Sequence, residues 1–382
     1  MDSSKGWVVM SMFDEGGYGR VRKLIATAAA AAVIGGSMLG AVSAAGEYGE
    51  PQKIPDGSGY GAGEYDFDYS TVAATYGGDI YQYATGADGA GYYSVYGGES
   101  WSDWSGWDGQ PVEYWYEPTA VTYKDATYVY YAGKDGSLYQ NSYDGASWNG
   151  WNNLAGDYKI KCAPYVNVDG DYQYLYATAE DGGIYIKSYD GAAWTDWYKV
   201  SGDVGSDYEP YAVSWGDYEQ VFWHGTDGSV YWARYDGSAW SEAKPLPGDY
   251  QLSYTPYAAG YDDNLYAFSV DTNGYATYNV FDGEGWSGWT PISGNYTYAA
   301  QPSAYVYDDA LQVVYTGTDG HAYYIEYGAE GWSDWADLGD NYAYDPYQYT
   351  WDETLFLTYT GANGEIYYKT YAGGDGEGDG GY

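Results

Sequence analysis

The chain has 382 residues, of which 55 are acidic and 14 basic, and its net charge of −41 at pH 7 excludes binding to nucleic acids or anionic lipid surfaces, because both would be repelled. Its hydrophobic content of 45% and aromatic content of 21% are too high for a disordered chain, and a single cysteine, Cys162, excludes a disulfide scaffold.

Residues 1–45 have the three parts of a secretory signal peptide and leader. Three basic residues precede an uncharged apolar stretch of 19 residues at positions 24–42, and small residues follow at positions 43–45. We therefore expect cleavage after Ala44 or Ala45, which gives a secreted, extracellular protein with no remaining membrane segment. An uncleaved membrane anchor is the alternative, because 19 apolar residues nearly span a bilayer.

A short turn recurs seven times after residue 70, at spacings of 47, 46, 46, 46, 46 and 44 residues. Asp-Gly and Asn-Gly pairs between alternating segments are typical of tight hairpins. An aromatic residue stands eight positions after each Asp or Asn, which marks seven equivalent repeats. The turns are Asp88-Gly89, Asp135-Gly136, Asp181-Gly182, Asp227-Gly228, Asn273-Gly274, Asp319-Gly320 and Asn363-Gly364.

Each repeat contains four runs with the pattern of a β-strand. The first opens near a proline in six repeats, the second alternates tyrosines with other residues, the third follows the turn, and the fourth carries the motif Trp-x-x-Trp. Seven such units predict an all-β chain folded as a seven-bladed β-propeller of four-stranded blades over residues 46–371. Residues 372–382 form a Gly-rich acidic C-terminal tail.

The seventh repeat lacks its Trp strand, and the segment after the leader has the spacing to replace it. Tyr48 and Ile54 are six residues apart, as are the first Trp and a later apolar residue in the other repeats. We expect residues 47–54 to supply the outer strand of the last blade and so to protect its edge. The strand can close the ring within its own chain or in a neighbouring chain.

The Trp pairs are the candidate ligand-binding residues. Residues i and i+3 of a strand point to opposite faces, so we expect each pair to face both neighbouring blades, with one indole packed and the other offered to a sugar ring at the rim. The fourth repeat, with Trp240 and Ala243, is expected to be the weak one. The candidate residues are Trp148, Trp151, Trp194, Trp197, Trp286, Trp289, Trp332 and Trp335.

The repeat, illustrated by residues 143–151, resembles the seven-bladed lectins of the Photorhabdus lectin type, whose blades carry Trp-x-x-Trp. The resemblance covers residues 47–371 and implies binding of fucose or O-methylated sugars between adjacent blades. The chain departs from this pattern in its tyrosine content, in Ala243, and in the absent seventh Trp pair. A second turn, before the fourth run of a repeat, also looks like a sialidase Asp box, as in residues 142–148. Arg234 alone, however, cannot supply the arginine triad of that enzyme.

Residues that carry catalytic or metal chemistry are scarce. His224 and His321 fall in different repeats, and Cys162 has the position of a buried packing residue. Asp169-Gly170-Asp171 and the Asp-Gly turns offer oxygen ligands for calcium. Turn chemistry alone explains the presence of these residues, so we expect no cofactor. The sequence favours a non-catalytic, lectin-like propeller that binds glycans or a cell-surface polysaccharide. The alternatives are a self-associating subunit of an extracellular filament or surface layer, and an enzyme that uses the central channel.

Overall fold

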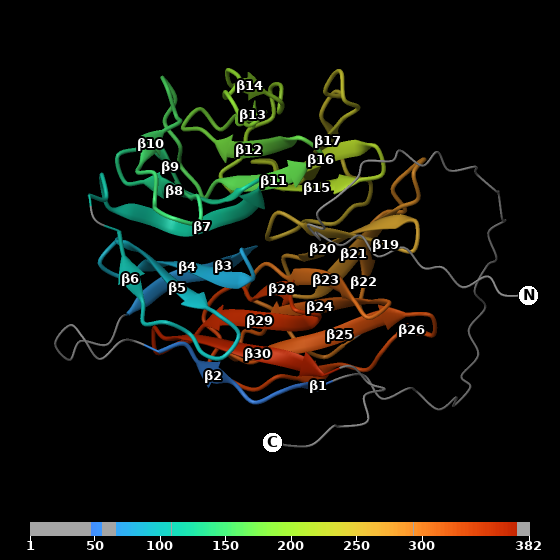
Figure 1. The fold of residues 1–382 in the computed structure, drawn as a ribbon. Coiled ribbons are helices and arrows are strands. Elements are labelled where there is room, and N and C mark those ends of the chain that lie inside the picture. The colour runs from blue at the N-terminus through green and yellow to red at the C-terminus, as the bar shows by residue number, and fades with distance from the viewer. Residues whose placement is uncertain (1–46, 56–65, 108, 293, 373–382) are drawn as a thin grey trace, which may run out of the picture.

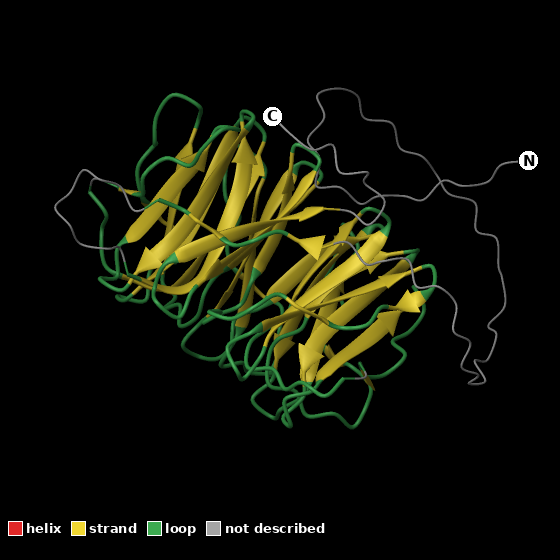
Figure 2. Cartoon of the chain, turned by 90° about the horizontal axis from the view of Figure 1, so that it is seen from below, coloured by secondary structure: helices red, strands yellow, loops and turns green. Residues whose placement is uncertain are grey.

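The structure is a computed structural model that describes residues 47–55, 66–107, 109–292 and 294–372. The described residues form strands, turns and loops without any helix, and therefore include no helix long and apolar enough to cross a membrane (Figure 2). The strands make seven antiparallel sheets arranged in a ring (Figure 1). The predicted all-β, seven-bladed propeller is confirmed.

Each blade is numbered by its position along the chain. Blade 1 comprises β3 (Phe67–Tyr76), β4 (Asp79–Gly86), β5 (Gly91–Tyr96) and β6 (Ser105–Gly106). Blade 2 comprises β7 (Tyr114–Tyr123), β8 (Ala126–Gly133), β9 (Leu138–Tyr143) and β10 (Asn152–Asn153). Blade 3 comprises β11 (Tyr165–Asp169), β12 (Tyr172–Thr178), β13 (Ile184–Tyr189) and β14 (Tyr198–Lys199). Blade 4 comprises β15 (Tyr211–Trp215), β16 (Tyr218–His224), β17 (Val230–Tyr235) and β18 (Lys244–Pro245).

The remaining blades complete the ring. Blade 5 comprises β19 (Tyr257–Tyr261), β20 (Asn264–Val270), β21 (Ala276–Phe281) and β22 (Thr290–Pro291). Blade 6 comprises β23 (Ser303–Tyr307), β24 (Ala310–Thr316), β25 (Ala322–Gly328), β26 (Gly331–Trp332) and β27 (Ala336–Asp337). Blade 7 comprises β28 (Tyr347–Trp351), β29 (Thr354–Thr360) and β30 (Ile366–Ala372), with β1 (Glu47–Tyr48) and β2 (Gln52–Lys53) as its outer strands.

The repeated turn between the second and third strands is held by its own side chains. In blade 2, Asp135 Oδ1 accepts a hydrogen bond from the backbone N–H of Ser137 at 2.9 Å, and Oδ2 accepts one from the Tyr139 hydroxyl at 2.9 Å. Gly136 has a φ of 80°, which a glycine adopts without a steric penalty. In blade 5 the turn residue is Asn273, and Asp271 takes over by accepting from the N–H groups of Asn273 and Tyr275. The tyrosine four residues after the turn therefore stabilises the hairpin in most repeats.

The hydrophobic core is divided into clusters that lie between consecutive blades. One cluster joins Tyr83 of blade 1 to Tyr114, Val129 and Tyr131 of blade 2, all at most 1% exposed. Buried tyrosines retain a polar end that needs a partner. Tyr131 donates to the carbonyl of Ala84 at 3.0 Å, which ties blade 2 to blade 1. Packing between blades thus accounts for these buried tyrosines.

The N-terminal segment lies along the outer edge of blade 7, where the two ends of the described chain meet (Figure 1). β1 and β2 both pair antiparallel with β30, in the registers Tyr48↔Tyr371 and Lys53↔Tyr367. Ile54 is fully buried, and its N–H donates to the carbonyl of Ile366 at 2.9 Å. In the structure, residues 47–54 therefore supply the outer strand that the seventh repeat lacks.

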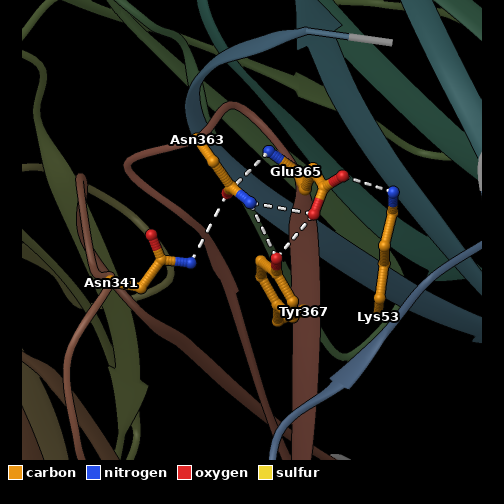
Figure 3. A network of polar contacts seen from close by, with 5 residues as sticks. All are labelled: Lys53, Asn341, Asn363, Glu365 and Tyr367. Atoms are coloured by element: carbon orange, nitrogen blue, oxygen red, sulfur yellow. Dashed lines mark hydrogen bonds and ion pairs between the residues drawn. The ribbon is translucent and has the colours of Figure 1, made fainter. Parts of the chain in front are cut away.

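A polar network at the end of this strand fixes it to the last turn (Figure 3). The Lys53 ammonium forms an ion pair with Glu365 Oε1 at 2.5 Å. Glu365 Oε2 accepts from Asn363 Nδ2 at 2.8 Å and from the Tyr367 hydroxyl at 2.5 Å. Asn341, from the connection between blades 6 and 7, donates to Asn363 at 3.4 Å.

Candidate functional site

The Trp pairs lie where the chain passes from the third strand of a blade to its short outer strand. Trp148 forms an isolated β-bridge with Tyr143, and five other blades have the same bridge or strand pairing between the first Trp and the last aromatic residue of the third strand. The next regular strand, β10, begins only at Asn152. The residues between the two indoles are therefore not part of a continuous strand.

Both indoles of a pair face the same neighbour, and the predicted projection toward both neighbouring blades is wrong. Trp148 and Trp151 both contact Trp107 of blade 1, with ring centroids 5.2 and 5.3 Å apart. The pairs of blades 1, 3, 5 and 6 likewise join the cluster shared with the preceding blade. Side chains alternate only along a regular strand, and Gly150, with a φ of 89°, interrupts it.

The eight candidate tryptophans are buried or partly buried. Trp289 is 8% exposed, and none of the eight belongs to the exposed large hydrophobic residues. The Trp197 indole N–H donates to the carbonyl of Leu154 at 3.0 Å, across the interface with blade 2. Packing between blades therefore accounts for much of each indole surface, and only part of each indole is available to a ligand.

The Trp pairs of blades 2 and 5 are each backed by an asparagine on the third strand, six positions after the first residue of the turn, that the sequence analysis did not identify. Asn141 Oδ1 accepts from the N–H of Gly150, between the two indoles of blade 2, at 3.0 Å, and Asn279 Oδ1 accepts from Gly288 in blade 5 at 2.9 Å. Both asparagines are at most 2% exposed. The constant distance from the Asp-Gly turn was the signal that could have found them.

The equivalent residue in blade 3 is a lysine. The Lys187 Nζ lies 5.6 Å from the Trp194 ring centroid and 5.1 Å from that of Trp197, which is a cation–π arrangement. Burial lowers the pKa of Lys187. This interface thus combines two indoles with an ammonium group, whereas those of blades 2 and 5 combine indoles with an amide.

A cavity of about 410 Å³ lies at the centre of the ring, lined by the innermost strands of all seven blades. Three acidic residues that directly precede repeat prolines line it: Glu117, Glu209 and Asp345. Desolvation by burial, followed by mutual repulsion, raises the pKa of Glu117 to about 8 and that of Asp345 to about 7. The sequence analysis missed them because carboxylates are abundant everywhere, although their place before the proline was a usable signal.

The remaining reactive residues have structural partners. His224, in blade 4, is 8% exposed, and its Nε2 lies 2.7 Å from the carbonyl oxygen of Leu252. His321 lies in blade 6, and its Nδ1 is 3.0 Å from Asp337 Oδ1 of the same blade. Cys162 is buried, as expected, and burial raises its pKa to about 12. Among the residues that the structure describes, no three acidic, histidine or cysteine side chains lie close enough together to hold a metal ion.

Neither protein-family models nor curated proteins match this chain. Among solved structures, the BP39L lectin from Burkholderia pseudomallei superposes with a TM-score of 0.71 at 14% sequence identity, covering 82% of this chain and 98% of the lectin. BBS1N, solved in complex with ARL6DN, has a TM-score of 0.57 at 12% identity and covers 85% of this chain and 96% of its own. The fucose-specific lectin from Aleuria aurantia reaches 0.49 at 15% identity, covering 70% and 96%.

The superpositions on BP39L and BBS1N establish a shared propeller fold and, at these identities, the fold alone. A lectin and BBS1N both have it, so function has to be argued from the site rather than from the fold.

Proposed function

We propose that the mature chain is a secreted, non-catalytic carbohydrate-binding propeller with several weak sites between its blades. The observation that carries the proposal is the repeated placement of two indoles and a polar third-strand residue in one inter-blade interface. Sugars present apolar C–H faces surrounded by hydroxyl groups, and a partly exposed indole beside backbone polar groups suits both. The resemblance to lectins of the Photorhabdus type supports the same reading.

The sites act together because they are repeated around one ring. Each partly buried indole pair offers little surface, so a single site is expected to bind weakly. Several sites that engage one polysaccharide raise the overall affinity without any strong contact. A multivalent glycan or a cell-surface polysaccharide is therefore the expected partner, with fucosides and O-methylated sugars as the first ligands to test.

A glycan array probed with the folded protein, residues 46–382, tests the proposal. We expect binding to multivalent fucosylated or O-methylated glycans and millimolar affinity for the monosaccharides in titrations. Absence of binding to every glycan, by a protein whose melting curve shows it to be folded, would contradict the proposal.

A matched pair of variants tests the location of the sites. Trp289→Phe shortens one indole pair, and we expect it to weaken monosaccharide binding at the blade 4–5 interface about threefold to tenfold. Ala243→Trp completes the defective pair of blade 4, and we expect it to add a site at the blade 3–4 interface. The number of sites, measured by titration calorimetry, should rise by one in Ala243→Trp, and an unchanged number would place the sugar elsewhere.

A further inference from the structure

The central channel has a wall of tyrosines, and no tryptophan among the described residues lines it. Tyr165, Tyr211 and Tyr257 occupy the same position in blades 3, 4 and 5, one residue after the repeat proline, and all three line the cavity. Their ring centroids are 4.7 Å apart between Tyr165 and Tyr211 and 4.3 Å apart between Tyr211 and Tyr257. Tyr347 lines the same cavity from blade 7. The faces of such rings attract cations.

Three carboxylates line this cavity and interact electrostatically with one another. Glu117, Glu209 and Asp345 come from blades 2, 4 and 7, which spaces them around the ring. Each pair among them repels electrostatically. None of the ion pairs formed by the described residues includes any of the three, so their negative charge is not balanced by a lysine or arginine of the described chain.

The shape of the site distinguishes between kinds of cation. The carboxylates share one cavity, yet among the described residues no acidic trio is close enough to hold a single metal ion. A ligand with more than one positive charge and an apolar body that lies against tyrosine rings satisfies them without a single central ion. Linear alkyl diamines and polyamines have this chemistry.

We propose that the central channel is a binding site for a linear diamine or polyamine, held by Glu117, Glu209 and Asp345 and by the tyrosine wall of blades 3 to 5. The site is distinct from the proposed glycan sites, because none of the paired tryptophans lines the cavity. The ligand ammonium groups supply the counter-charge that the described chain does not.

Titration calorimetry with putrescine and spermidine, at a salt concentration of about 0.5 M to screen the acidic surface, tests the proposal. We expect one site per chain, and about tenfold weaker binding in Glu117→Gln/Glu209→Gln. The control variant Asp157→Asn/Asp203→Asn removes the same charge from two exposed loop positions, and we expect its affinity to be unchanged. Equal weakening in both variants would assign the binding to diffuse surface attraction and overturn the proposal, as would no binding at millimolar polyamine.

Proton release gives a second readout that surface binding does not produce. Burial and mutual repulsion raise the pKa values of Glu117 and Asp345 to about 8 and 7, so these carboxyl groups are partly protonated at pH 7. Burial also raises the pKa values of the nearby Tyr116, Tyr254 and Cys162, which therefore stay neutral. A bound cation favours the ionised carboxylates and releases protons. The heat of binding should therefore depend on the ionisation enthalpy of the buffer in the wild-type protein and lose most of that dependence in the double variant. A buffer-independent heat in the wild-type protein would contradict the site.

Discussion

The interface between blades 6 and 7 and the interface between blades 1 and 2 have the same backbone frame and different side chains. The N–H of Gly49 donates to Thr370 at 2.8 Å, as the N–H of Asn149 donates to Ser142 at 2.8 Å in blade 2. Tyr48 takes the place of the first Trp, opposite Tyr371, and Pro51 that of the second.

The closing interface is held by a buried polar cluster instead of indoles. The Tyr48 hydroxyl accepts from Gln348 Nε2 at 2.8 Å, and Glu326 accepts from the hydroxyls of Tyr324 and Tyr371. Buried polar groups are costly unless each has a partner, so such a cluster tolerates few arrangements. The comparison shows that backbone pairing alone positions the outer strand of a blade, so its side chains can differ between interfaces. They are indoles at the proposed ligand sites and hydrogen-bonded polar groups where the ring closes.

The largest effect is expected when the closing strand is removed. Deleting residues 46–55 takes away the buried Ile54 and the partly buried Tyr48 and leaves the outer edge of β30 unpaired. We expect the free energy of unfolding to fall by about 5 kcal/mol or more, and the truncated protein to melt at least about 10 °C lower and to aggregate. Thermal melting and size-exclusion chromatography of both forms measure this.

The same pair of proteins tests whether the strand closes its own ring. We expect the intact protein to remain monomeric at every concentration. Intact protein that forms larger particles, together with a truncated form that stays folded and monomeric, would indicate strand exchange between chains and favour a filament subunit over a lectin.

A single substitution measures how much one buried side chain of the N-terminal strand contributes to the free energy of unfolding. Ile54→Ala removes a fully buried side chain, and we expect it to cost about 3 kcal/mol of unfolding free energy. Leu154→Ala, at the equivalent position of blade 2, is the control, because its N–H makes the same backbone hydrogen bond to Leu138 and its side chain is only partly buried. Denaturant unfolding should show the smaller loss in Leu154→Ala. A larger loss there would mean that the N-terminal strand is not packed in solution.

The sequence determined the repeat more securely than the orientation of its side chains. The Asp-Gly turns follow from the chemistry of neighbouring residues, and the Tyr48–Ile54 spacing is recognised by comparison with the other repeats. Both features are visible in the sequence, and each has its counterpart in the structure. The direction of the Trp pairs depends on where a two-residue strand begins, and no local pattern specifies that. The channel carboxylates are brought together from blades 2, 4 and 7. Their shared place before the repeat proline is visible in the sequence, but the contact between distant repeats is not.

A third interface, between blades 3 and 4, extends the comparison to a buried carboxylate with neutral partners. Glu219 is 1% exposed and accepts hydrogen bonds from Ser214 at 2.7 Å, from Tyr176 at 2.7 Å and from Asn167 at 2.9 Å. Desolvation by burial nevertheless raises its pKa from 4.5 to about 7. The folded protein therefore holds a proton that the unfolded chain has lost between these pH values.

The raised pKa of Glu219 determines how the stability of the protein changes with pH. Because the folded state binds more protons, the contribution of Glu219 to stability is fully present below pH 4.5 and is lost as pH rises through about 7, by about 3 kcal/mol in total. Glu219→Gln keeps the shape and removes the titration, so the difference in unfolding free energy between the variant and the wild type should grow between pH 5 and pH 8. A difference that stays constant over this range would show that Glu219 does not carry the proton. The comparison of two proteins cancels the channel carboxylates, which titrate in both.

The smallest effect concerns the two lysines that occupy the same third-strand position in blades 3 and 7. Lys187 lies over the rings of Trp194 and Trp197, whereas Lys369, which donates to the carbonyl of Leu338 at 2.7 Å, faces the interface where Tyr48 and Pro51 replace the indoles. A partly desolvated ammonium over an indole contributes about 0.5–1 kcal/mol. A double-mutant cycle of Lys187→Met with Trp197→Phe should therefore show a coupling of about that size in unfolding free energy, because the two changes remove the same interaction. The matched cycle of Lys369→Met with Trp197→Phe combines residues in different interfaces, and we expect no coupling. Equal couplings in the two cycles would mean that Lys187 packs through its alkyl chain alone, and that its charge does not distinguish the blade 2–3 interface from the others.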